Sequence, residues 1–192
     1  IHPTLKTPLA FAELDPPEDP TIIFYREPAA PDMEIETTPQ LLDAVDTARI
    51  LWIPASRFAF GRSRTTVTEL LQRRNRKHHT VLDLDWRPMF WDSEEQAHAA
   101  ISPMLDHVTI AIGNRKECEV AVGTYDPDEA ADRMLDRGLD AAIVKLGGDG
   151  VMVATPQLRE RLSPYPVEVV CGLGSGDAFG GAFCHGLLEG WS

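Results

Sequence analysis

A glycine-rich run near the end of the chain has residue types that could perform chemistry. Residues 172–177 read Gly-Leu-Gly-Ser-Gly-Asp and precede a small-residue, apolar stretch, 178–188, that predicts a helix. Glycines lack a Cβ, so successive backbone N–H groups can point at one spot, and a helix N-terminus adds the positive end of its dipole. We therefore expect the amides of Gly174, Ser175 and Gly176 to form an anion site.

Asp177 ends this run and has two interpretations. A carboxylate at a helix start is commonly a cap that also suits the dipole. Beside an anion site, the same group can take the proton of an attacking hydroxyl, while the amides hold the charge of a transferred phosphoryl group. We favour the base because the carboxylate adjoins the expected anion site.

Asn114 and Glu117 follow the predicted strand 107–112 and are three residues apart, on one face of a helical turn. One interpretation is a capping box, in which each side chain bonds the other residue's backbone amide. The other is a pair that points at a metal-bound water. Spacing alone favours the capping box.

Two further motifs stand at predicted strand ends. Asp83 and Asp85 lie on one face, and Arg87 can bind a carboxylate or phosphate with two bonds, although an internal Asp–Arg pair is the simpler interpretation. Lys145 begins a Lys-Leu-Gly-Gly-Asp-Gly turn between two apolar runs, which predicts a tight hairpin. The lysine either neutralises phosphate or is simply solvated, and the residues leave both open.

Composition sets limits on the class of protein. The 192 residues are 43% hydrophobic, which is enough for one sizeable core. A net charge of −12 argues against nucleic acid or an anionic membrane as the main partner. Three cysteines without paired spacing indicate reduced thiols and a cytoplasmic location. No apolar run approaches the roughly 20 residues of a membrane span.

Strand-like and helix-like segments alternate along the chain. This alternation predicts an α/β fold with a mainly parallel sheet, helices on both faces, and ligands at the carboxyl ends of the strands. The expected strands are 9–14 and 21–25, which form a hairpin, and 50–53, 79–84, 107–112, 141–145 and 166–170. The expected helices are 38–48, 64–74, 93–104, one from 114, 128–137 and 178–188.

The glycine run and Asp177 resemble the C-terminal signature of the ribokinase-like (PfkB) carbohydrate kinases. The resemblance implies that residues 174–176 are the anion hole and that Asp177 is the catalytic base. Cys171 and Gly172 depart from the usual polar pair of this signature. The departure affects nearby nucleotide or ion contacts, not the glycine turn itself.

The same resemblance assigns a nucleotide site. Asn114 and Glu117 are similar to the family's magnesium and phosphate motif, which implies ATP and Mg²⁺, with Glu117 acting through water. Gly147 and Gly150 match a glycine element that approaches ATP by its backbone, and Lys145 would stand beside the phosphates.

A sugar site follows from two other segments. Residues 83–91 resemble the family members that act on keto-sugar acids, which implies substrate contacts by Asp83 and Arg87. Tyr25 and Arg26 resemble a segment that holds a substrate's acid group, and a guanidinium suits a planar carboxylate. Arg26 is the preferred carboxylate-binding residue, and the implied substrate is 5-dehydro-2-deoxy-D-gluconate of myo-inositol catabolism.

The expected protein is thus a partial kinase domain, a ribokinase-like three-layer α/β/α sandwich incomplete at both termini. Residues 1–30 would form a hairpin on the sugar side, and residues 31–192 an α/β core with the ATP site. Alternatives are a 2-keto-3-deoxygluconate kinase, a fructokinase, or a catalytically inactive nucleotide-binding fragment. The expected partners are the sugar acid and ATP, with a homodimer left open, and the 192 residues alone are expected to be inactive.

Overall fold

The computed structural model describes residues 2–17, 20–27 and 29–191. These residues form two compact units: residues 35–164, and a smaller unit of the described residues up to 34 together with 165–191. The sequence placed the border at residue 30 and assigned everything beyond it to one core. In the structure, the C-terminal segment with the glycine run belongs to the same compact unit as the N-terminal hairpin, and the division into a sugar-side hairpin and an ATP-binding core stays a prediction.

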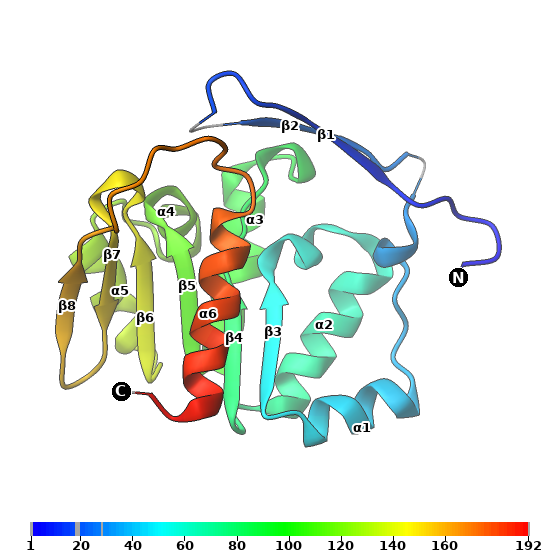
Figure 1. Ribbon diagram of the computed structural model, residues 1–192. Coiled ribbons are helices and arrows are strands. Elements are labelled where there is room, and N and C mark those ends of the chain that lie inside the picture. The colour runs from blue at the N-terminus through cyan, green and yellow to red at the C-terminus, as the bar shows by residue number, and fades with distance from the viewer. Residues whose placement is uncertain (1, 18–19, 28, 192) are drawn as a thin grey trace. The chain divides into compact units, whose positions relative to one another are not determined.

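A six-stranded sheet forms the larger unit, with the order β3-β4-β5-β6-β7-β8 (Figure 1). The strands β3 to β6 are mutually parallel, whereas β7 and β8 are antiparallel to their neighbours. Their bounds are β3 Ile50–Pro54, β4 His79–Asp83, β5 Ile110–Asn114, β6 Ala141–Lys145, β7 Val151–Ala154 and β8 Arg159–Leu162. The mainly parallel sheet that the sequence predicts is confirmed.

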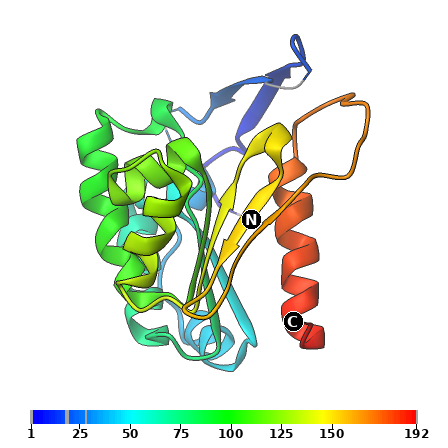
Figure 2. The same cartoon turned by 90° about the vertical axis from the view of Figure 1, so that its left-hand side faces the viewer.

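Burial explains why the central strands are continuous apolar runs rather than alternating ones. The middle residues of β5 and β6 are apolar and buried without alternation, as in parallel strands generally. The helices of this unit are α1 Pro39–Thr47, α2 Gly61–Arg74, α3 Glu94–Ile101, α4 Arg115–Val122 and α5 Pro127–Leu135. Figure 2 shows α3, α4 and α5 on the same side of the sheet, where their apolar residues join the core.

Strand register determines which polar residues meet at the carboxyl edge of the sheet. Pro54 pairs with Asp83, Asp83 pairs with Ile112, and Asn114 pairs with Lys145. Because these strands are parallel, the residues that follow them emerge at the same edge. This edge is therefore where the motifs of the larger unit gather.

The smaller unit contains a hairpin and a helix. Strands β1 (Leu9–Glu13) and β2 (Thr21–Tyr25) are antiparallel, so the predicted hairpin is confirmed, although residues 18 and 19 of its turn lie outside the described residues. Helix α6 spans Ser175–Glu189. None of the helices in the described parts of the chain has the length and apolarity to cross a bilayer.

The strand predicted for residues 166–170 was wrong. This segment has no regular structure, and Val167 and Val170 are 71% and 81% exposed. β-branched residues favour strands when a neighbouring surface covers them, and the exposure of these valines shows that their unit does not cover them. The sequence also missed β8, whose arginines and glutamate give no apolar signal but whose backbone pairs with β7.

Candidate active site

The residues predicted to form an anion site lie at the N-terminus of α6. Gly174 is the residue before the helix and has φ 82°, a left-handed conformation that glycine adopts without strain. The first helical bond runs from the Ala178 amide to the Gly174 carbonyl at 2.9 Å. The helix therefore supplies no acceptor for the amides of Gly176 and Asp177. The Ser175 amide already donates to the Gly172 carbonyl at 3.2 Å, so it is less available to a ligand.

Asp177 is the third residue of α6, and its side chain is exposed. Gly174, at the capping position, has no side chain that could accept from the first turn. The carboxylate thus stands in solvent beside two amides that the helix leaves without acceptors. This geometry is compatible with a proton acceptor next to an anion.

In the larger unit, Asp83, Glu117 and Lys145 gather at the carboxyl edge of the sheet. Glu117 is only 6% exposed, and the Lys145 Nζ atom lies 3.5 Å from its Oε2 atom. Burial raises the pKa of Asp83 to about 6; Lys145 opposes this shift, and the charges of Asp85 and Glu117 add to it. The edge therefore concentrates negative charge around one lysine.

Asn114 and Glu117 form the capping box at the start of α4. The Asn114 amide donates to Glu117 Oε2 at 2.6 Å, and the Glu117 amide donates to Asn114 Oδ1 at 2.8 Å. The first of these bonds commits Oε2 of the buried Glu117 carboxylate to the start of α4. Across the described residues, no group of three or more His, Cys, Asp or Glu side chains is arranged to hold a metal ion.

The turn between β6 and β7 uses much of its own backbone. The Gly150 amide donates to the Gly147 carbonyl at 3.0 Å, and the Leu146 amide donates to the Gly150 carbonyl at 2.8 Å. A Cβ at Gly150 would lie 2.0 Å from the carbonyl oxygen of Leu162. Gly150 thus serves the turn, whereas Gly147 is exposed, has φ +64°, and has open space where a Cβ would lie.

Arg87 forms the internal pair that spacing alone favours. Its Nη2 atom lies 2.8 Å from Asp85 Oδ1, and the other oxygen, Oδ2, accepts from Ser56 Oγ at 2.6 Å. Ser56 was not among the site residues predicted from the sequence. Only the register of β3 and β4 could have indicated Ser56, because Ser56 lies two residues after the end of β3, just as Asp85 lies two residues after the end of β4.

The acid-binding residues expected on the hairpin have other contacts. Arg26 pairs with the Asp32 carboxylate, and its side chain is 13% exposed. Tyr25 is 60% exposed and packs edge to face against Phe11, with ring centroids 5.4 Å apart. The structure thus gives Arg26 a carboxylate of its own chain within the smaller unit.

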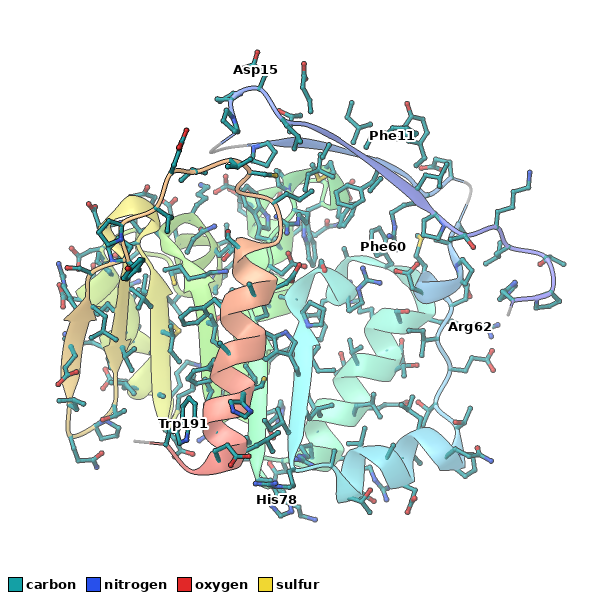
Figure 3. All side chains as sticks on the ribbon, in the orientation of Figure 1. Phe11, Asp15, Phe60, Arg62, His78 and Trp191 are labelled. Carbon is teal, nitrogen blue, oxygen red and sulfur yellow. The ribbon has the colours of Figure 1, made fainter. Side chains whose placement is uncertain are left out.

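Histidines take no part in these clusters. His78 lies directly before β4, at the end of the sheet opposite Phe60 (Figure 3). Phe60 packs edge to face on Phe90, with centroids 4.7 Å apart, beside the carboxyl edge. The histidines show no ligand spacing in the sequence, and none of the described ones joins a cluster that could hold a metal ion.

Comparison with known proteins shows what this arrangement is similar to. The family model described as pfkB family carbohydrate kinase matches residues 1–192. The 5-dehydro-2-deoxygluconokinase of Geobacillus thermodenitrificans is 30% identical over 192 residues, covering 96% of this chain and 56% of that protein. The protein of the same name from Clostridium perfringens is 30% identical over 190 residues, with coverages of 95% and 56%.

Solved structures show the same fold. A PfkB protein from Polaromonas sp. JS666 has a TM-score of 0.83 at 21% identity, covering 98% of this chain and 62% of that one. Fructokinase from Vibrio cholerae O395, solved with fructose, ADP and calcium ion, has a TM-score of 0.79 at 20% identity, with coverages of 97% and 60%. The chain spans little more than half the length of the curated relatives it matches. With the family model matched over its whole length and the fold shared, the chain belongs to the pfkB family of carbohydrate kinases.

Proposed function

We propose that the protein containing this chain transfers the γ-phosphoryl group of ATP to the terminal hydroxyl of a keto-sugar acid, 5-dehydro-2-deoxy-D-gluconate. The observation that carries the proposal is the exposed carboxylate of Asp177 beside the amides at the start of α6. The family match and the names of the relatives support the reaction class and the substrate.

Asp177 takes the proton of the sugar hydroxyl while the oxygen of that hydroxyl forms a bond to the γ-phosphorus. The bond from that phosphorus to the β–γ bridging oxygen breaks, and ADP leaves with the electron pair. The amides of Gly176 and Asp177 hold the charge on the transferred group, because hydrogen-bond donors that are already oriented need no rearrangement during the reaction. Gly174 gives the chain the turn that aims these amides.

On the nucleotide side, Lys145 and the exposed Gly147 are the groups we assign to ATP phosphates. Lys145 is 26% exposed, and its pairing with Glu117 at 3.5 Å leaves donors for a second anion. Asn114 and Glu117 fix the start of α4 beside it. Magnesium fits best as part of the ATP complex, where it would neutralise phosphate charge, since the described residues offer no metal site made of protein ligands alone.

For the sugar acid, we assign Asp83 and Arg87 within the larger unit and, separately, Tyr25 and Arg26 within the smaller unit. Arginine suits the carboxylate because its donors match that group's planar shape. A fructokinase is the second candidate, favoured by the pairing of Arg26 with Asp32, which already satisfies the charge of that arginine. A neutral sugar would leave this pair intact.

A coupled assay of ATP consumption on the complete protein tests both candidates. The panel contains 5-dehydro-2-deoxy-D-gluconate, 2-keto-3-deoxygluconate and fructose. We expect the highest kcat/KM for the first acid. A preference for fructose would select the second candidate, and no turnover with any sugar would contradict the kinase proposal.

A further inference from the structure

A polar chain of three side chains runs from the interior of the larger unit to its surface. Ser56 Oγ donates to Asp85 Oδ2 at 2.6 Å, and Asp85 Oδ1 lies 2.8 Å from Arg87 Nη2. Ser56 is 3% exposed, the Asp85 side chain 19% and the Arg87 side chain 41%. The chain therefore has a fixed inner end and an accessible outer end.

Strand pairing holds the inner end in place. Pro54, the last residue of β3, pairs with Asp83, the last residue of β4. Ser56 lies two residues after Pro54, and Asp85 lies two residues after Asp83. The contact between Ser56 and Asp85 thus joins two connections that adjacent parallel strands bring together. Because both oxygens of Asp85 have partners, the plane of its carboxylate is defined on both sides.

Arg87 is the part of this chain that a ligand can reach. A guanidinium has five N–H donors, and the contact that joins Arg87 Nη2 to one oxygen of Asp85 cannot occupy all of them. A flexible arginine loses rotamer freedom when it binds an anion, so holding it beforehand reduces the cost of binding. An oriented Arg87 would bind a planar carboxylate more tightly than an unrestrained one.

Arg26 makes a useful contrast within the smaller unit. It is 13% exposed and paired with Asp32, so binding a substrate carboxylate would require it to exchange partners. Arg87 needs no such exchange, because its outer face is open while its inner face holds Asp85. Arg87 can therefore bind an anion without giving up its present partner.

We infer that Ser56 and Asp85 are positioning residues that set the direction of Arg87 toward the carboxylate of the sugar acid. The inference rests on the proposed function and deepens it. It makes acid recognition depend on a buried serine that touches no substrate. It also gives a role to the aspartate at position 85.

The test measures steady-state KM and kcat, and calorimetric binding of 5-dehydro-2-deoxy-D-gluconate, on the complete protein. For Arg87→Gln, we expect KM and Kd for the acid to rise roughly 10- to 100-fold, because this is the loss of affinity that follows from losing a charged hydrogen bond. KM for ATP should stay within about twofold, since the phosphates are not involved. Arg159→Gln, which removes an exposed arginine on β8, is the matched control and should change neither constant.

Ser56→Ala and Asp85→Asn should each raise KM for the acid by a smaller factor, about 3- to 10-fold, with kcat nearly unchanged. In the Arg87→Gln background, neither should add a further rise, because residues that act through one group are not additive. Ser56→Thr keeps the hydroxyl and should restore most of the affinity that Ser56→Ala loses. Asp85→Asn serves as the independent variant if Ser56→Ala fails to fold.

Additive effects of Ser56→Ala and Arg87→Gln would overturn the positioning role, as would a rise in KM for ATP in place of the acid. Calorimetry separates this inference from the proposed function. Arg87-dependent binding of the acid without turnover of any sugar would contradict the kinase reaction alone. Turnover of the acid with unchanged binding in Arg87→Gln would contradict the inference alone.

Discussion

Asn114 and Glu117 exchange hydrogen bonds across the first turn of α4. Each backbone amide donates to the other residue's side chain, at 2.6 and 2.8 Å. Lys145 approaches the same Glu117 oxygen from the neighbouring strand, at 3.5 Å. A single carboxylate thus joins the end of β5, the start of α4 and the end of β6.

Asn114→Ala and Glu117→Gln should separate the structural role of this pair from its charge. Asn114→Ala removes the acceptor for an amide of the first turn and should cost about 1 kcal/mol in the free energy of unfolding. Glu117→Gln keeps an oxygen acceptor and should lower the free energy of unfolding by less. It also removes the negative charge that pairs with Lys145, so KM for ATP should change. Urea denaturation and steady-state kinetics measure the two effects.

The control for this pair is Ser93→Ala, because Ser93 caps α3 by accepting from the Gln96 amide at 3.2 Å. It should cost a similar free energy without changing KM for ATP. If Asn114→Ala left stability untouched and abolished ATP binding, the asparagine would serve the ligand and not the helix.

Asp83→Asn should stabilise the protein above pH 6. Burial raises the pKa of Asp83 from 3.8 to about 6, so the fold favours the protonated form. The native state then holds more protons than the unfolded state between these values, and stability falls as pH rises through this window. Above it, the charged side chain costs the fold about 1–2 kcal/mol after allowance for partial solvation.

Urea titrations at pH 4 and pH 8 test this prediction. The Asn variant should exceed the parent at pH 8 by that amount and approach it at pH 4, where Asp83 is largely protonated in the fold. Asp43→Asn, which changes an exposed carboxylate on α1, should show no such pH-dependent gain. A stability difference independent of pH would rule out the buried charge as its cause.

The positions of the central strands along the chain were predictable, because an apolar run marks each buried strand. Strand β6 begins and ends where its apolar run predicts, at Ala141 and Lys145, and the hairpin of β1 and β2 was also found. The strand expected at residues 166–170 failed for the complementary reason. A valine-rich sequence favours a strand, but the strand forms only where other parts of the fold bury it, and that segment is exposed.

The candidate site was less predictable, because its contacts join residues distant in sequence. Ser56 meets Asp85 only through the register of β3 and β4, which periodicity does not reveal. The pairing of Arg26 with Asp32 depends on how the chain folds back after β2. By contrast, the capping box of Asn114 could be predicted from the sequence, because both of its partners lie within one helical turn.

Gly150→Ala should destabilise the larger unit strongly. A Cβ there would lie 2.0 Å from the Leu162 carbonyl oxygen, and the residue has φ +92°. The turn or β8 must shift to relieve the clash, which we expect to cost at least about 2 kcal/mol. Gly148→Ala is the matched control, because a Cβ at Gly148 meets nothing within 4 Å and the residue is not left-handed.

Thermal and urea unfolding compare the two glycine variants, with KM for ATP measured on each. The control should lie within about 0.5 kcal/mol of the parent. Equal stability of both variants would show that the turn yields to the added methyl group. A rise in KM for ATP confined to Gly148→Ala would place the nucleotide on the exposed part of the turn and not on Gly150.

Asp177→Asn should lower kcat by about 10²- to 10⁴-fold in the complete protein, the range lost with a general base. ATP binding should change little, because the backbone amides beside the side chain are retained and one negative charge near the phosphates is removed. The variant loses a favourable charge in the first turn of α6, worth about 0.3–1 kcal/mol, so the variant should fold nearly normally. Glu189→Gln, at the opposite end of the same helix, is the matched control and should keep full activity. Near-parental kcat in Asp177→Asn would remove this carboxylate from the base role, and the exposed group at the start of α6 would then be a dipole partner only.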